Sequence, residues 1–151
     1  ILKFKNNKKF NYTILRPTSI YGIGLNKNKI IYKYFKKLKL NKKLTIYDYE
    51  NTLVNFIHAK DVARAIYLCL VYKKKGIFNL GSKSCSNFYD LTKIFKKIIK
   101  SKSKIELIRT NRPRPLRSLD VDIRKSIEVL NWSPNIKLKK GLKMFVEKKW
   151  I

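Results

Sequence analysis

Two spacings of apolar residues alternate along this chain, one typical of strands and the other of helices. Pro17 closes the first strand-like run and has no backbone N–H, so we expect a strand to end there and a loop to follow. Short runs rich in β-branched and aromatic residues predict five strands, at residues 12–16, 44–47, 53–57, 76–80 and 105–108.

Helical spacing marks the segments between these runs. One predicted helix is clearly delimited: Asp61 lies in its first turn, lysines 73–75 in its last turn, and Gly76 ends it. Its apolar face is expected at Val62, Ile66, Cys69 and Leu70. Further helices are predicted by stripes at Ile30, Ile31, Tyr34, Phe35 and Leu38; at Leu91, Ile94, Phe95, Ile98 and Ile99, starting near Asn87 with Asp90 in the first turn; at Ile123, Ile127 and Leu130, capped by Asp122; and at Leu138, Leu142, Phe145 and Val146. Strands separated by helices of this length indicate an α/β fold.

The charge of the chain changes this picture little. A formal net charge of +28 over 151 residues would favour a nucleic-acid partner, since Lys and Arg neutralise phosphates. Only seven of the 37 basic residues are arginines, and the positive charge is spread along the whole chain. We therefore interpret the lysines as solvated helix faces, and a basic nucleic-acid-binding module stays the less favoured alternative.

Other classes are disfavoured by what the sequence lacks. No run approaches the roughly 18 apolar residues of a membrane span, and no leader pattern is present, so a cytoplasmic location without membrane contact is expected. Cys69 and Cys85 have no neighbours at metal-ligand spacing, so reduced thiols and no metal site are expected.

Four segments in a fixed order carry the strongest functional signal. They are Thr13-Ile-Leu-Arg-Pro-Thr-Ser-Ile-Tyr-Gly22, Phe56-Ile-His-Ala-Lys-Asp-Val-Ala-Arg-Ala65, Gly76-Ile-Phe-Asn-Leu-Gly81, and Asp122-Ile-Arg-Lys followed by Leu130-Asn-Trp-Ser-Pro134. Together they resemble the C-terminal half of the NAD-dependent epimerase/dehydratase family, the extended short-chain dehydrogenases/reductases that act on nucleotide sugars. The chain also begins at Ile1 rather than Met, so we interpret residues 1–151 as a C-terminal fragment.

The resemblance implies a fold and a function. The fold would be the C-terminal part of an extended Rossmann-type NAD(P)-binding domain, meaning its last strands and the small substrate-binding lobe. The cofactor would be NAD, with NADP as an alternative, the substrate a nucleotide sugar, and the intact parent a homodimer. Within the same superfamily, an NADPH-dependent reductase stays an alternative.

The resemblance also implies site residues. Pro17 and Thr18 would lie at the nicotinamide, and Ser19 at the sugar nucleotide, where the family usually has Asn. Asn28 and Lys29, at the start of a helix, would meet the substrate diphosphate, because a helix N-terminus attracts anions.

Arginine is a second means of holding that diphosphate. Arg112, ten residues before Asp122, would bind it through its guanidinium group, and Arg114 could take the role instead. Val54 and Asn55 stand where the family usually has Arg-Asp, which favours a divergent substrate.

Three conspicuous residues are assigned to structure instead of chemistry. By resemblance, His58 and Asp61 end a strand and cap a helix, and Trp132 packs the closing helix. The chain has no GxxGxxG loop, and the Tyr-x-x-x-Lys pair that moves the proton is expected upstream of Ile1. Tyr32 and Lys36 have that spacing but lie past the start of the helix that would meet the substrate. We therefore expect no catalytic residue in the chain and no activity from it alone.

Overall fold

The computed structural model describes residues 12–48, 52–110 and 117–148, and of residues 117–119 the backbone alone. The helices are α1 (Ile30–Lys39), α2 (Ala59–Val71), α3 (Phe88–Ile99), α4 (Arg124–Leu130) and α5 (Leu138–Glu147). The strands are β1 (Thr13–Pro17), β2 (Ser19–Tyr21), β3 (Leu44–Tyr47), β4 (Thr52–Val54), β5 (Phe56–His58), β6 (Gly76–Leu80), β7 (Ile105–Ile108) and β8 (Arg117–Leu119). The α/β class is therefore confirmed, and all five predicted strand regions form strands.

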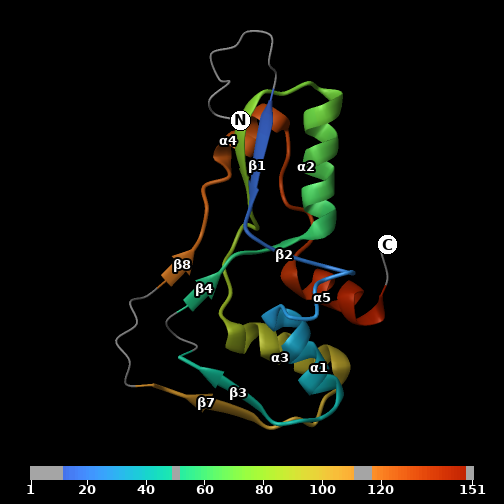
Figure 1. Ribbon diagram of the computed structural model, residues 1–151, viewed down its shortest axis with the longest axis vertical. Helices are drawn as coiled ribbons and strands as arrows, with labels where there is room; N and C mark the ends of the chain where they lie inside the picture. The colour runs from blue at the N-terminus through green and yellow to red at the C-terminus, as the bar shows by residue number, and fades with distance from the viewer. Residues whose placement is uncertain (1–11, 49–51, 111–116, 149–151) are drawn as a thin grey trace.

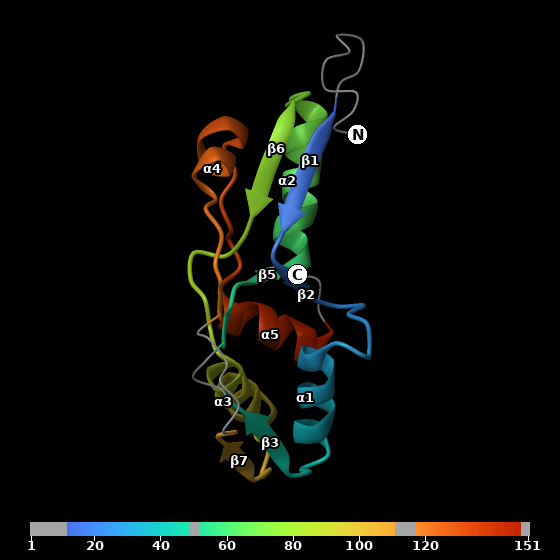
Figure 2. The same cartoon turned by 60° about the vertical axis from the view of Figure 1, so that its left-hand side comes forward.

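The described strands pair in parallel. β1 pairs with β6, β2 with β5, β3 with β7 and β4 with β8. Parallel neighbours need a crossover connection, and long segments that include helices join each of these pairs. Figure 1 shows β1, β6, α2 and α4 in the upper half of the molecule and α1, α3, β3 and β7 in the lower half, and Figure 2 shows the same division after a turn of 60°.

Each half has its own apolar core. We call the first the upper core, which joins β5, β6, α2 and α4 through Ile57, Ala65, Cys69, Phe78, Leu80, Leu130 and Trp132. The lower core joins α1, α3 and α5 to strands β2, β3, β4 and β5 through Tyr21, Ile31, Leu38, Leu44, Ile46, Val54, Phe56, Leu91, Phe95, Leu142 and Phe145. β5 contributes to both cores, because Ile57 belongs to the upper one and Phe56 to the lower. The short strand β5 thus ties the two halves together.

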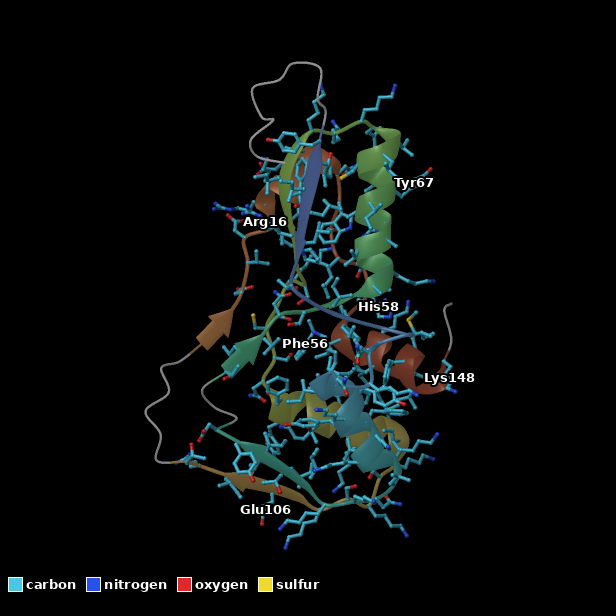
Figure 3. All side chains as sticks on the ribbon, viewed as in Figure 1. Arg16, Phe56, His58, Tyr67, Glu106 and Lys148 are labelled. Atoms are coloured by element: carbon cyan, nitrogen blue, oxygen red, sulfur yellow. The ribbon has the colours of Figure 1, made fainter. Side chains whose placement is uncertain are left out.

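The C-terminal end of α2 differs from the prediction. The helix ends at Val71, before the lysines at 73–75, and Lys73 has a left-handed backbone with φ 47°. The predicted apolar face is also partly wrong, because Ile66 and Leu70 are 46% and 72% exposed. The buried stripe instead follows Asp61, Ala65 and Cys69 at intervals of four residues. Tyr67 lies on the outer side of this helix (Figure 3).

The strand predicted at residues 53–57 is divided at Asn55 into β4 and β5. Asn55 is fully buried, and its backbone carbonyl accepts a hydrogen bond from the N–H of Ser19. That bond starts the pairing of β5 with β2, a strand that the sequence pattern did not predict because it begins directly after Pro17 and Thr18. β8 was not predicted either. Both missed strands have three residues, too few to show a period.

The predicted helix starts agree well with the structure. The His58 side chain caps α2 by accepting from the N–H of Lys60, and Asn87 caps α3 by accepting from the N–H of Asp90. At α4 the N-cap residue is Ile123, but the carboxylate of Asp122 accepts the N–H of Arg124. The capping role expected of Asp122 is thus performed from one residue earlier.

Candidate functional site

A cavity of about 1060 Å³ opens where β1 ends, β2 passes and α1 begins. Pro17, the last residue of β1, and Thr18 form one part of its wall, and Asn26 and Lys29 before α1 form another. Most of the remaining lining is apolar, from Ile20, Ile23, Leu25, Ile30, Ile31, Val54, Phe56, Phe88 and Val121. A cavity beyond the carboxyl end of a parallel strand is where open α/β sheets bind their ligands.

The structure brings four of the predicted site residues to this cavity. Pro17, Thr18, Ser19 and Lys29 all line it. Asn28 is absent from the lining, and its backbone N–H donates to Oδ1 of Asn26 at 2.8 Å.

Asn26 is therefore the amide side chain that reaches the wall, and sequence reasoning missed it. The turn that its side chain makes with the N–H two residues later is the signal that could have indicated it. Arg112 and Arg114 lie outside the described residues.

The first turn of α1 gives the cavity a positive end. Lys29 is the N-cap residue of this helix, and no side chain caps it. Ile30 and Ile31, which follow, line the cavity. Since the first N–H groups of a helix have no partner within the helix, they and the Lys29 ammonium can hold an anion there.

At the other end of the cavity, the Asn55 side chain holds the lining residues Thr18 and Asp120 in place. Its Oδ1 accepts from the Thr18 hydroxyl at 3.1 Å and from the N–H and hydroxyl of Ser82 at 2.6 and 3.0 Å. Its Nδ2 donates to the Ser82 carbonyl at 2.9 Å and to Oδ1 of Asp120 at 3.1 Å. Gly81 lies so close that a Cβ there would come within 3.1 Å of the Asn55 amide oxygen. One buried amide thus fixes Thr18 and Asp120 relative to each other.

Asp120 is the acidic side chain among the cavity-lining residues, and sequence reasoning did not single it out. The backbone N–H of Val121 donates to its Oδ1 at 2.8 Å. That bond and the one from Asn55 hold the pKa of Asp120 below its usual value, with a smaller contribution from Cys85. Asp120 is therefore an ionised hydrogen-bond acceptor at the cavity.

The histidine and the buried tyrosine beside this region have structural surroundings. Burial lowers the pKa of His58, an effect partly offset by the Asp61 carboxylate. Burial and, to a smaller extent, the Asp61 carboxylate raise the pKa of Tyr21 well above the ordinary tyrosine value. Within the part of the chain that the structure describes, Tyr21 Oη and His58 Nε2 have no hydrogen-bond partner. In Figure 3, His58 lies where the two halves of the molecule meet.

Two pairs have the Tyr-x-x-x-Lys spacing on a helix, and neither is arranged for proton transfer. Tyr32 packs edge-on against Phe145 in the lower core. Tyr89 and Lys93 share α3, but Lys93 Nζ lies over the Tyr89 ring, 4.5 Å from its centroid, and forms an ion pair with Asp90. None of these residues lines the cavity.

Two further properties concern the described residues alone. They contain no group of three or more His, Cys, Asp or Glu side chains placed to hold a metal ion. Their helices are all too short or too polar to cross a membrane.

The fold and the cavity define an α/β protein with parallel strands and a candidate ligand site beyond the carboxyl end of β1. A sequence profile described as the NAD dependent epimerase/dehydratase family matches residues 1–81, more than half of the chain. The chain belongs to this family.

Known relatives agree with that membership. Human dTDP-D-glucose 4,6-dehydratase is 29% identical over 145 residues, which cover 92% of this chain and 41% of that protein. The chain thus spans about two fifths of the length of the curated relative it matches.

Solved structures share the fold. UDP-glucose 4-epimerase from Thermotoga maritima, solved with UDP-glucose, superposes with a TM-score of 0.83 at 23% identity, over 97% of this chain and 48% of that one. UDP-glucuronic acid 4-epimerase from Bacillus cereus, solved with UDP-glucuronic acid and NAD, gives a TM-score of 0.82 at 23% identity, over 97% and 47%.

Proposed function

We propose that this chain is the substrate-facing part of an NAD-dependent nucleotide-sugar epimerase or dehydratase. The observation that carries the proposal is the cavity, which unites Thr18 and Ser19 with Lys29 and the start of α1. Family membership and the names of the relatives support the same reading. Residues 1–151 would then comprise the last strands of the Rossmann sheet and the substrate-binding lobe.

Pro17 and Thr18 are proposed to border the nicotinamide. The fit is chemical: Pro17 presents a ring without an N–H, and the Thr18 hydroxyl is directed to Asn55, so both offer a neutral surface to a flat ring. NAD, when bound, takes up a hydride from a sugar carbon. The residues of this chain would orient the sugar and exclude water, with NADP as the alternative cofactor.

The substrate diphosphate is proposed to lie at the start of α1. Lys29 and the unpaired N–H groups of the first turn supply positive charge, and Ser19 supplies a hydroxyl. Asn28 does not line the cavity and is left out of this set, and Asn26 lies on the wall in its place. Arg112, or Arg114 in its place, would add a guanidinium group from the segment before β8.

The proton-transfer pair is proposed to lie upstream of Ile1, because neither Tyr32 nor Tyr89 is placed to act at the cavity. The chain alone should therefore bind a nucleotide sugar without converting it. The intact parent is proposed to be a cytoplasmic homodimer.

Calorimetric titration tests this proposal. The 151-residue chain, at an ionic strength of about 0.15 M, is titrated with UDP-glucose, dTDP-glucose and uridine. At least one nucleotide sugar should bind at one site, and uridine, which lacks the diphosphate, should bind far more weakly. Equal binding of uridine, or no binding of either nucleotide sugar, would contradict the proposal.

Two variants then separate the arginine alternatives. Arg112→Ala and Arg114→Ala are each compared with Arg16→Ala, which removes an exposed arginine that is not part of the cavity lining. Removal of the arginine that contacts the diphosphate should weaken nucleotide-sugar binding by about tenfold. Removal of either of the other two arginines should have little effect.

The reductase alternative rests on Val54 and Ser19, which stand where the family usually has Arg and Asn. The buried side chain of Val54 makes an apolar stretch of cavity wall in place of the arginine. A small carbonyl substrate without a diphosphate would suit such a wall. If neither nucleotide sugar binds in the titration and the parent protein binds NADPH, the reductase hypothesis would be favoured.

A further inference from the structure

Asp120 is an unusual carboxylate in a chain with a net charge of +28. Several other carboxylates among the described residues form ion pairs, namely Asp61, Asp90, Glu106, Asp122 and Glu147. Asp120 is exposed, yet it forms no ion pair with a cation among the described residues. Its hydrogen bonds instead come from neutral groups, the Asn55 amide and the Val121 N–H.

Asn55, which donates a hydrogen bond to Asp120, is buried, and its amide oxygen and nitrogen are both hydrogen-bonded. Asn55 has no exposed surface, and both ends of its amide are engaged, with Thr18 and Ser82 on the oxygen and Ser82 and Asp120 on the nitrogen. An aspartate at this position could not donate to Asp120 and would repel it. The amide at position 55 is therefore what allows a carboxylate to stand at the cavity wall.

Asp120 keeps the capacity to bind a ligand. A carboxylate can accept about four hydrogen bonds, and Asn55, Val121 and Cys85 account for three. A single amide group separates it from the Thr18 hydroxyl, so it belongs to the Thr18 end of the cavity. A negative group there attracts hydrogen-bond donors and repels anions.

We propose that Asp120, held by Asn55, accepts a hydrogen bond from a hydroxyl group of the sugar and makes the chain select nucleotide sugars with a neutral hexose over those with a uronic acid. The inference rests on the proposed function and deepens it, because it assigns the charge class of the substrate. A diphosphate is attracted by the positive start of α1, whereas the uncharged, hydroxyl-rich sugar fits the acidic end.

The test compares three ligands on two matched variants. We would titrate the unchanged chain and two variants, Asp120→Asn and Asp122→Asn, with UDP, UDP-glucose and UDP-glucuronic acid. Asp120→Asn keeps an oxygen that can accept from Asn55 and Val121 but removes the charge. Asp122→Asn is the control, since Asp122 is also an exposed carboxylate but pairs with Arg124 and does not line the cavity. Thermal unfolding of both variants verifies that the fold is retained.

The expected result is selective. The unchanged chain should bind UDP-glucose more tightly than UDP-glucuronic acid. Asp120→Asn should weaken UDP-glucose binding about tenfold and tighten UDP-glucuronic acid binding. It should change UDP binding by less than about twofold. Asp122→Asn changes none of these affinities. If UDP and UDP-glucose bind but Asp120→Asn affects them equally or not at all, the role of Asp120 is overturned while the proposed function stands. If the unchanged chain binds neither, the proposed function is overturned and this inference with it.

Discussion

The rings of Tyr21 and His58 meet edge to face, with centroids 5.3 Å apart and an interplanar angle of 87°. Both are almost completely buried, and both lie against Gly141 of α5. Tyr21 ends β2 and His58 ends β5, and these two strands are paired. The contact of both rings with Gly141 therefore joins the strand pair to α5. The packing of this ring pair decides how closely α5 can approach β5.

Replacing Gly141 by alanine should destabilise the fold. A Cβ at this position would overlap the Tyr21 hydroxyl and come within 2.9 Å of His58 Cδ2. Alanine ordinarily favours a helix over glycine, so a loss of stability isolates the packing effect. We expect a loss of about 1–3 kcal/mol in the free energy of unfolding, measured by urea denaturation.

A double variant provides the control. Tyr21→Phe removes the hydroxyl that the new Cβ would strike, so Gly141→Ala should cost less in the Tyr21→Phe background than alone. Equal losses in the two backgrounds would show that the overlap is not the cause.

The stability of the chain should fall in mild acid because of His58. Burial holds its pKa in the folded chain below the ordinary value of 6.5, so the unfolded chain binds more protons as the pH drops through that value. The contribution of neutral His58 is therefore present above about pH 6.5 and is lost below it. His58 is also the one histidine of the chain, and its Nδ1 caps α2 only when unprotonated.

Urea midpoints measured between about pH 5 and 7.5 check this expectation. The unchanged chain should become less stable toward the acid end. His58→Asn, whose side chain can still accept from the Lys60 N–H but does not titrate, should show a flatter dependence in the same range. An identical slope in both proteins would assign the effect to other groups.

Asp61 should be the most costly carboxylate to remove. It is buried, and its oxygens accept from the N–H groups of Asn135 and Ile136 at 3.0 Å each. Asp61→Ala would leave these donors without a partner, for a loss of about 2–4 kcal/mol in the free energy of unfolding. Asp90→Ala, which removes a half-exposed first-turn carboxylate paired with Lys93, should cost less than about 1 kcal/mol. Comparable losses for the two would contradict the assignment.

The sequence was sufficient for the class of fold and for several helix starts. His58 and Asn87 are cap residues with side chains that bond the first turn, and that chemistry is local and can be read from neighbouring residues. The division at Asn55 and the pairing of Ser19 with Phe56 depend on contacts between distant segments. The exposed side chains of Ile66 and Leu70 show the same limit, because only the packing of α2 decides which stripe is buried.

The candidate site shows a similar division. The resemblance led to Pro17, Thr18, Ser19 and Lys29, which the structure brings to one cavity. Asp120 was not predicted because its relation to Asn55 spans 65 residues and follows no short motif. Whether any of these residues contacts a ligand stays a prediction.

Lys29 should contribute to binding through its charge. Lys29→Ala is expected to weaken the binding of a nucleoside diphosphate by about tenfold, because the ammonium group stands at the open start of α1. Lys37→Ala removes an exposed lysine from the last turn of the same helix and is the matched control. Titrations with UDP decide between them: equal effects would indicate binding to the general positive charge of the chain.

Backbone chemical-shift mapping by NMR tests the central claim most directly. When UDP-glucose is added to the chain at an ionic strength of about 0.15 M, the amide signals of Thr18, Ser19, Lys29, Ile30 and Ile31 should move together and saturate as one site. The amide signals of lysine-rich surfaces far from the cavity, such as the region around Lys73 and Lys74, should not shift. Shifts spread over these lysines, or reproduced by any polyanion such as a short RNA, would contradict a nucleotide-sugar site in this cavity.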